Sequence, residues 1–242
     1  MRTRRRKLIK NLPGRIQLVD TTAAAVRWVI QKYHYSETAP CAPLNCYWIT
    51  AGKKPVGAIT LGVGSGATRV GVPRRLFGRR IHHRQWRSVE RLVLFPRWNG
   101  GNIISQTFSL LFRLAALAGW RFLHTVADER AGYGAGYRAA NFVPTRQWTS
   151  DCFADMTKTK YSALGVVHKV SYQATCARID RGDIPSGPRT RIMGRIYKRT
   201  GEKAFLKMIE KTRGRVLRLK QYEYVRVIDN SLKLLPLSAH LQ

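Results

Sequence analysis

The stretch Leu92-Val-Leu-Phe-Pro-Arg-Trp-Asn-Gly-Gly-Asn-Ile-Ile-Ser-Gln-Thr-Phe108 decides how this chain can fold. An apolar run typical of a strand ends at Phe95, a polar loop carries Gly100 and Gly101, and apolar residues at helical spacing begin at Ile103. Glycines at such a junction let the backbone approach an anion, and the first-turn amides of the helix supply the positive end of its dipole. The pattern predicts a pyrophosphate site. The alternative is an ordinary strand-to-helix turn that uses glycine for its geometry.

Strand and helix signals alternate on both sides of this stretch. They predict helices at residues 23–33, 103–118 and 132–140 and strands at residues 46–50, 56–64, 89–95, 121–127, 161–172 and 222–228. The order predicts the α/β (α+β) class, with a mixed central sheet and flanking helices in three layers. The expected segments are a basic N-terminal arm (1–20), a core (21–172), a basic, partly helical segment (173–221) and a last strand with the C-terminal tail (222–242).

The charge balance is extreme, because 44 Lys and Arg residues stand against 13 Asp and Glu residues, a formal net charge of +31. Self-repulsion of this size destabilises a compact chain unless a polyanion is nearby, which argues for a nucleic-acid partner and against most metabolic enzymes. Hydrophobic residues make up 44% of the chain, which argues against a disordered protein.

The positive charges gather in the arm at residues 2–15, an expected loop at 69–91 and the tail at 178–220. A solvated face is the alternative explanation for such runs, but solvated faces usually mix signs. The expected DNA contacts are Arg4, Arg5, Arg6, Arg79, Arg80, Arg84, Arg191 and Arg195.

Signals for membranes and secretion are weak. The most apolar stretch, residues 103–120, is too short and too polar to span a bilayer, and the basic start lacks the apolar core of a signal peptide. The four cysteines, which form no CxxC pair, are Cys41, Cys46, Cys152 and Cys176. We therefore expect them to be reduced thiols, and we expect the protein to be soluble and cytoplasmic.

Residues 126–142, Val-Ala-Asp-Glu-Arg-Ala-Gly-Tyr-Gly-Ala-Gly-Tyr-Arg-Ala-Ala-Asn-Phe, leave a strand and enter a short helix. The end of this block resembles the Tyr-x-x-x-(Gly/Asn)-Phe helix of the GNAT acyltransferase superfamily, in which the tyrosine, here Tyr137, faces the sulfur of coenzyme A. The resemblance implies a GNAT-like sheet and acetyl-CoA or another CoA-type donor, although the superfamily's usual basic-x-x-Gly-x-Gly/Ala loop is absent. It places Gly100, Gly101, Asn102 and Ser105 on the superfamily's pyrophosphate loop, and Arg91 is a further candidate cofactor-binding residue.

A wider set of motifs occurs in a fixed order: Lys-Tyr-His-Tyr-Ser at 32–36 with Pro40, Gly-Ala-Ile at 57–59, Glu-Arg-Leu-Val at 90–93, and Gly-Asn-x-x-Ser at 101–105. In this combination, over roughly residues 20 to 230, the chain resembles the Mom family of bacteriophage DNA-modification proteins. The resemblance implies conversion of adenine in DNA to a carbamoylmethyl-type adenine that protects phage DNA from host restriction nucleases. It also implies double-stranded DNA with a flipped adenine as the partner, in the cytoplasm of a bacterial host.

The candidate catalytic residues are Asp128, Tyr35, His34, Glu90 and Tyr137. The exocyclic amine of adenine is a weak nucleophile, so a carboxylate that accepts its proton matters, and Asp128 at a strand end is the first choice, with Tyr35 as its orienting partner. Each residue also has a plainer explanation: Asp128 as a helix cap, His34 as a complement to a helix dipole, and Tyr35 as part of the core.

Glu90 and Arg91 alternate on a strand, so they face opposite sides of the sheet and one of them would need a partner inside. In a GNAT-like architecture the strands of Glu90 and Asp128 part at the centre of the sheet, and adenine would enter there. Tyr133 lies near Tyr137 on the same helix face, so either tyrosine could be the acid.

A carbamoylmethyl group is joined through a methylene carbon, which simple acyl transfer does not produce. An unusual donor or a redox metal therefore stays open, with His34 and Asp128 as the first residues to test as ligands. Two other classes of function also stay open. The chain could be a nucleic-acid-directed GNAT N-acetyltransferase, or a non-enzymatic DNA-binding or architectural protein in which the glycines merely turn the backbone.

Overall fold

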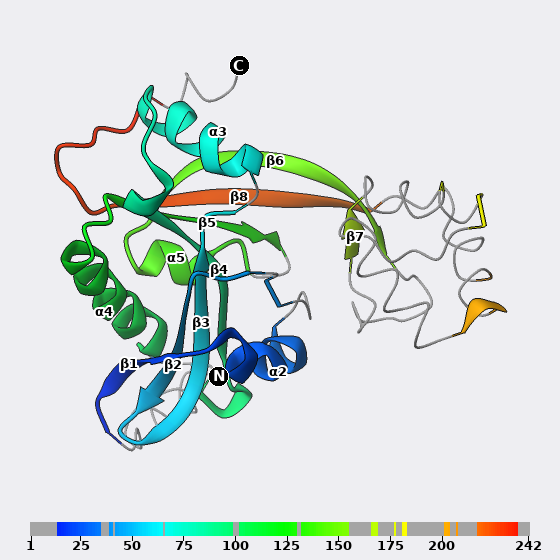
Figure 1. Cartoon of the computed structure of the whole chain (residues 1–242), viewed down its shortest axis with the longest axis horizontal. Helices are drawn as coiled ribbons and strands as arrows, with labels where there is room; N and C mark the ends of the chain where they lie inside the picture. The colour runs from blue at the N-terminus through cyan, green and yellow to red at the C-terminus, as the bar shows by residue number, and fades with distance from the viewer. Residues whose placement is uncertain are drawn as a thin grey trace. The chain divides into compact units, whose positions relative to one another are not determined.

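The computed structural model describes residues 14–34, 39–40, 42–64, 66–98, 102–129, 132–154, 166–168, 177, 181–182, 201–203, 207 and 217–236. The chain forms two units, residues 1–147 with 221–242 and residues 148–220 (Figure 1). Most of the described residues, and all of those that form the candidate site, belong to the first unit.

A mixed sheet forms the centre of the first unit. Its strands are β1 (Ile16–Thr21), β2 (Asn45–Ala51), β3 (Lys54–Gly62), β4 (Trp86–Leu94), β5 (Phe122–Asp128), β6 (Val143–Ala154) and β8 (Leu217–Val227), the last two of which continue into the second unit. The strand order is β1-β2-β3-β4-β5-β8-β6-β7. Strands β4 and β5 are parallel, whereas β1–β2, β2–β3, β3–β4 and β5–β8 are antiparallel. In the second unit, β7 (Val166–His168) pairs antiparallel with the end of β6.

Helices cover both faces of this sheet: α2 (Ala23–Tyr33), α3 (Gly66–Phe77), α4 (Ile103–Leu117) and the short α5 (Ala135–Ala139), with 3-10 turns at His83–Gln85 and Pro96–Trp98. Successive strand residues point to opposite faces, and on β5 Leu123 packs in the core with α4 whereas Phe122 packs with α3. In the same way α2 packs on Cys46 of β2, whereas the neighbouring Tyr47 joins the core with α4. The predicted mixed sheet with flanking helices in three layers is therefore confirmed.

Local sequence signals account for α2 and α4, the helices whose bounds agree best with the prediction. Helix α2 begins after Thr22, whose hydroxyl accepts a hydrogen bond from the amide of Ala25 at 3.2 Å, and it buries Val26, Val29 and Ile30. Helix α4 buries one stripe of its surface and ends one residue before the predicted boundary. Both helices are long enough for their apolar period to be read from the sequence alone.

Three elements differ from the prediction. Residues 16–21, assigned mainly to the basic arm, form the edge strand β1, because Ile16 is buried and the backbone pairs with β2. Residues 66–77 form α3, where a basic loop was predicted for most of this segment. The prediction was wrong because glycines, Pro73 and three arginines interrupt the apolar pattern, which includes the buried Val72 and Leu76. Strand β6 was not predicted, and of the expected strand at 161–172 the described residues are 166–168, in β7.

Candidate functional site

The sheet opens where β4 and β5 stop pairing. Their parallel ladder runs from Trp86 opposite Phe122 to Val89 opposite Thr125 and ends there. At the same point β4 carries one extra residue, because Arg91 pairs with Thr60 and Val89 pairs with Leu61 of β3, which leaves Glu90 as a bulge. A bulge redirects a side chain and is common beside active sites. This parting of the strands of Glu90 and Asp128 is the arrangement that the GNAT resemblance implied.

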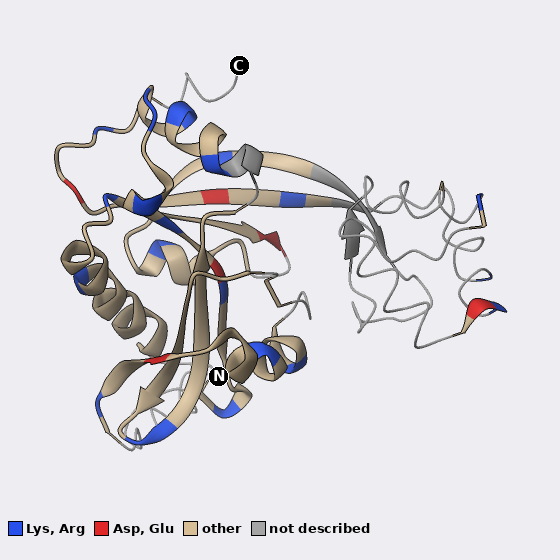
Figure 2. Ribbon diagram, in the orientation of Figure 1, with Lys and Arg blue, Asp and Glu red and all other residues tan. Residues whose placement is uncertain are grey.

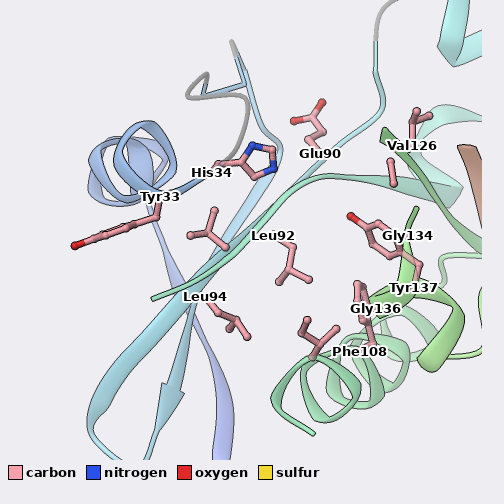
Figure 3. A pocket seen from close by; sticks show the side chains of 13 residues that line it. Tyr33, His34, Glu90, Leu92, Leu94, Phe108, Val126, Gly134, Gly136 and Tyr137 are labelled. Atoms are coloured by element: carbon pink, nitrogen blue, oxygen red, sulfur yellow. The ribbon is translucent and has the colours of Figure 1, made fainter. Parts of the chain in front are cut away.

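A cleft of about 270 Å³ lies at this opening, close to the lower end of the range for small-ligand sites, about 300 Å³. Figure 3 shows side chains from α2, β4, α4, β5 and the α5 region around it. The lining residues are Tyr33, His34, Glu90, Leu92, Val93, Leu94, Ile104, Phe108, Val126, Ala127, Gly134, Gly136 and Tyr137. Three of the five candidate catalytic residues, His34, Glu90 and Tyr137, therefore share one cleft with mostly apolar walls.

Glu90 is the carboxylate of this cleft. Burial raises its pKa, and the charge of Arg91 and a hydrogen bond from the backbone amide of Gly64 oppose that rise. Its Oε2 atom has no hydrogen-bond partner among the described residues. A Cβ at Gly62 would lie 2.2 Å from Oε1 of Glu90, so the carboxyl group occupies space that only glycine leaves open. The site thus holds a partly buried carboxylate with one oxygen unengaged by those residues.

Tyr137 enters the cleft from α5. Burial raises the pKa of its hydroxyl, while a hydrogen bond to Thr125 and the charge of Arg91 lower it. Thr125 in turn donates to the carbonyl of Val89 at 3.0 Å, the last paired position of β4. The Tyr137 hydroxyl is therefore tied to the point where the two strands part, and Figure 3 shows it directed into the cleft. Its raised pKa keeps it protonated at neutral pH.

The turn before α5 explains how Tyr137 is held. Gly134 has φ +67°, and a Cβ there would lie 2.5 Å from the ring of Tyr224, so both the conformation and the close approach require glycine. The hydroxyl of Tyr224 donates to the carbonyl of Tyr133 at 2.5 Å, and the rings of Tyr224 and Tyr137 lie 5.8 Å apart. Strand β8 thus clamps the start of α5. The alternative acid, Tyr133, is 48% exposed and does not line the cleft.

Two further polar residues bear on the site: His34 lines the cleft, and Arg91 follows Glu90 on β4 but does not line the cleft itself. His34 caps the C-terminus of α2, where its amide donates to the carbonyl of Ile30 at 3.0 Å, and its side chain is buried. Arg91 donates to the carbonyl of Glu90 at 2.5 Å, and its charge lowers the pKa values of both Glu90 and Tyr137. Arg91 was expected to bind a cofactor, and here it couples electrostatically to the two candidate proton-transfer groups.

Asp128, the first choice for the base, is the last residue of β5 and is only 4% exposed. It does not line the cleft, although the neighbouring Val126 and Ala127 do. Tyr35, Gly100 and Gly101 lie outside the described residues. Of the two candidate carboxylates, Glu90 lines the cleft and Asp128 does not.

Ser105 lies in the first turn of α4, and Asn102 precedes the helix without a side-chain capping bond. Of the expected DNA contacts, Arg79, Arg80 and Arg84 are exposed and lie between α3 and β4. Figure 2 shows Lys and Arg spread over the described part of the chain, with few Asp and Glu between them. Arg4, Arg5, Arg6, Arg191 and Arg195 lie outside the described residues.

The sequence profile of the Mom protein family matches residues 15–241. The chain belongs to the Mom family. Among curated proteins, no match to it was found.

Solved structures similar to this Mom-family protein include three acetyltransferases. An N-acetyltransferase from Staphylococcus aureus has a TM-score of 0.44 at 9% identity, over 89% of this chain and 99% of that chain. A GNAT-family protein from Desulfovibrio desulfuricans has a TM-score of 0.43 at 8% identity, over 88% and 99%. A probable GNAT acetyltransferase from Chromobacterium violaceum has a TM-score of 0.42 at 10% identity, over 88% and 87%.

The described residues of this Mom-family protein fit a CoA-type donor in two respects. Strand β4 has no pairing with β5 beyond Val89, which leaves one edge of β4 open along the cleft. Helix α4 begins at Ile103 beside this cleft, and the side chain of Asn102 makes no capping bond to its first-turn amides, the groups that bind anions at helix starts. No group of three or more His, Cys, Asp or Glu residues suited to a metal occurs among the described residues. In that part of the chain no helix is long and apolar enough to cross a membrane.

A second polar cluster of this Mom-family protein is buried between α3 and the sheet. Glu223 of β8 accepts hydrogen bonds from Arg75 of α3 at 2.5 and 2.6 Å, from Nε2 of His124 at 3.0 Å and from Thr145 at 2.8 Å. Ser88 contacts Nδ1 of His124 at 3.1 Å, so the order Ser-His-Glu imitates a hydrolase triad. Ser88 is 8% exposed and does not line the cleft, and the ion pair between Arg75 and Glu223 joins α3 to β8.

Sequence reasoning missed the apolar walls of the cleft. Leu92 and Leu94 alternate along β4, while Ile104 and Phe108 lie four residues apart on α4 and so share a helix face. These spacings can be read in the sequence of residues 92–108. They also fit an ordinary core, and only the parting of β4 and β5 turns them toward an opening.

Proposed function

We propose that this Mom-family protein modifies the exocyclic amine of adenine in DNA, giving a carbamoylmethyl-type adenine that resists host restriction nucleases. The observation that supports this most directly is the meeting of Glu90 and Tyr137 in one cleft between the parted strands. Glu90 combines a raised pKa with an unengaged oxygen, and Tyr137 stays protonated. A proton acceptor and a proton donor beside one apolar cleft suit transfer of a group to a weakly nucleophilic amine.

In this proposal Glu90 accepts the proton that the amine loses as its new nitrogen–carbon bond forms. Tyr137 donates its hydroxyl proton to the group that leaves the donor. Arg91 stabilises the Glu90 carboxylate, since its charge lowers the pKa of that group. Glu90 is preferred to Asp128 because Glu90 lines the cleft and Asp128 does not.

A CoA-type donor is part of the proposal, because the open edge of β4 and the uncapped start of α4 lie on the same cleft. When bound, the donor would supply a carbamoylmethyl group through its methylene carbon, since transfer of an acyl group would give an amide, and the donor's sulfur would leave as a thiol with the proton from Tyr137. Asn102, Ser105 and the first-turn amides of α4 would hold its pyrophosphate.

Binding to DNA is proposed from charge. The net charge of +31 and the exposed Arg79, Arg80 and Arg84 support contact with a polyanion. An adenine amine inside a duplex cannot reach a deep cleft, so the base would be flipped out of the helix. If phosphate contacts dominate, DNA affinity falls steeply with salt, with a slope of about 0.9 per phosphate neutralised.

Mass spectrometry of nucleosides from cells that express the protein tests the proposed function. The expected result is an adenine nucleoside of increased mass in DNA from wild-type cells and its loss with Glu90→Gln. An acetylated RNA base would instead indicate an RNA-directed acetyltransferase. Unmodified nucleosides in both DNA and RNA, together with tight DNA binding, would indicate an architectural protein.

A further inference from the structure

An aromatic cluster, here called the aromatic ledge, lies beside the cleft and consists of the exposed Trp28 and the half-buried Tyr33 and Phe95. Trp28 on α2 is 53% exposed, although tryptophan is usually well buried. Its ring stacks near Phe95 with centroids 6.5 Å apart and an interplanar angle of 27°, and Tyr33 meets Phe95 edge-on at 5.4 Å. Phe95 thus supports one side of the tryptophan ring, and more than half of the Trp28 surface remains open to solvent.

Exposed cations lie on the two segments that carry the ledge. Arg27 and Lys32 on α2 and Arg97 after β4 are all exposed. The Lys32 ammonium lies 5.3 Å from the Tyr33 ring, and the Arg97 guanidinium lies 4.8 Å from the ring of Trp98. Neither α2 nor the turn at Pro96–Trp98 contains an acidic residue. The local chemistry is therefore an open aromatic ring among positive charges.

The ledge adjoins the cleft through shared residues. Tyr33 belongs to the ledge and also lines the cleft, and Phe95 directly follows Leu94, another lining residue. His34, the next residue after Tyr33, is one of the polar groups of the site. In Figure 3 the Tyr33 ring projects from α2 away from the interior of the cleft. A ligand that fills the cleft and continues past α2 would meet the ledge next.

We propose that the aromatic ledge stacks on an unpaired nucleobase of the DNA next to the adenine held in the cleft. The inference rests on the proposed function. A flipped adenine leaves its strand locally unstacked, and a neighbouring base then has an open face for an aromatic ring. Arg27, Lys32 and Arg97 would contact the phosphates on either side. Aromatic rings interleaved with cations are the arrangement that proteins use for single-stranded nucleic acid without sequence choice.

The residues around the ledge fit a nucleic-acid ligand better than a protein partner. A protein interface usually depletes lysine at its centre, whereas α2 and the turn at Pro96–Trp98 together carry three exposed cations and no acidic residue. Base stacking on an aromatic side chain contributes about 5- to 150-fold to affinity, a large effect for one exposed side chain. The ledge would therefore select DNA that is already distorted at the target adenine.

The test uses the full-length protein and a duplex with 2-aminopurine beside a mismatched target adenine. Stacking on Trp28 quenches 2-aminopurine fluorescence in the wild-type complex. Trp28→Ala is expected to lose this quenching and about tenfold in affinity, whereas Trp28→Phe retains most of both. Leu117→Ala is the matched control, because Leu117 is 88% exposed on α4, across the sheet from α2, and its loss is expected to leave binding unchanged.

Thermal unfolding checks that the variants fold, and Trp28→Phe keeps the test valid if Trp28→Ala does not. If Trp28→Ala keeps the wild-type quenching and affinity, the proposed stacking is refuted. It is also refuted if Trp28→Ala changes the monomer–dimer equilibrium in sedimentation but leaves DNA binding unaltered. Arg97→Gln is expected to reduce the salt slope by about one phosphate, and an unchanged slope would refute the role of that cation. Loss of quenching in Trp28→Ala without any modified nucleoside in the wild type would support the ledge and reject the proposed function.

Discussion

Replacing Glu223 with Gln removes the negative charge of the buried cluster and keeps the shape of the side chain. Burial alone would raise the pKa of Glu223, but hydrogen bonds from His124 and Arg75 lower it from 4.5 to about 2. This lowering of the pKa corresponds to ~3 kcal/mol of folding free energy at neutral pH, at about 1.4 kcal/mol for each tenfold change in acid dissociation. Removal of one partner from a buried ion pair costs a similar amount, about 3–5 kcal/mol.

The dependence on pH follows from the sign of the shift. Because the folded-state pKa is lower than the unfolded value, the stabilisation is present above pH 4.5 and is lost as pH falls toward 2. Urea unfolding of wild type and Glu223→Gln at several pH values measures this. The two free energies of unfolding should differ by ~3 kcal/mol at pH 7, and the difference should shrink through the acid window.

Asp229 provides the control, because hydrogen bonds from Ser231 and Arg121 hold its pKa at about 2 at the surface of the protein. Solvent screens such a pair, so Asp229→Asn should destabilise the fold much less than Glu223→Gln does. If Glu223→Gln unfolds with the wild-type free energy, or if the difference does not change with pH, the buried charge does not hold α3 to the sheet and the reasoning fails.

The remaining predictions concern the chemistry of the cleft. Glu90→Gln should reduce DNA modification by at least about 100-fold with DNA affinity retained, whereas Asp128→Asn should cost less; the reverse order, by nucleoside mass spectrometry, would return the base to Asp128. Because an ionised Glu90 is needed, wild-type activity should rise with pH through the raised pKa of Glu90, and a pH–rate profile without that limb would contradict the assignment. Tyr137→Phe should lower the maximal rate more than it alters DNA binding, since only the proton donor is removed; an unchanged rate points to another acid. Coenzyme A at millimolar concentration should raise the melting temperature of wild type but not of Gly101→Val, and no shift in wild type would reject the CoA-type donor.

Much of the fold can be predicted from the sequence because helix and strand periods are local. The apolar spacing of residues 23–33 and 103–117 needs no tertiary information, and the strand-loop-helix order around Phe95 limits the architecture to a few forms. Edge strand β1 and helix α3 were not predicted, because tertiary contacts stabilise them more than their own sequences indicate. Strand β1 is stabilised by pairing with β2, and α3 by packing on Trp86 and Phe122.

The sequence by itself determined the family motifs, the positive charge and the residue types that a transfer site requires. Only the tertiary structure decided which of them meet: a bulge in β4 turns Glu90 into the cleft, and β5 ends with Asp128 outside its lining. The same holds for contacts far apart in the chain, such as Arg75 with Glu223 and Trp28 with Phe95. Local sequence cannot specify them because they depend on which strands pair, where pairing stops, and which side chains that brings into contact.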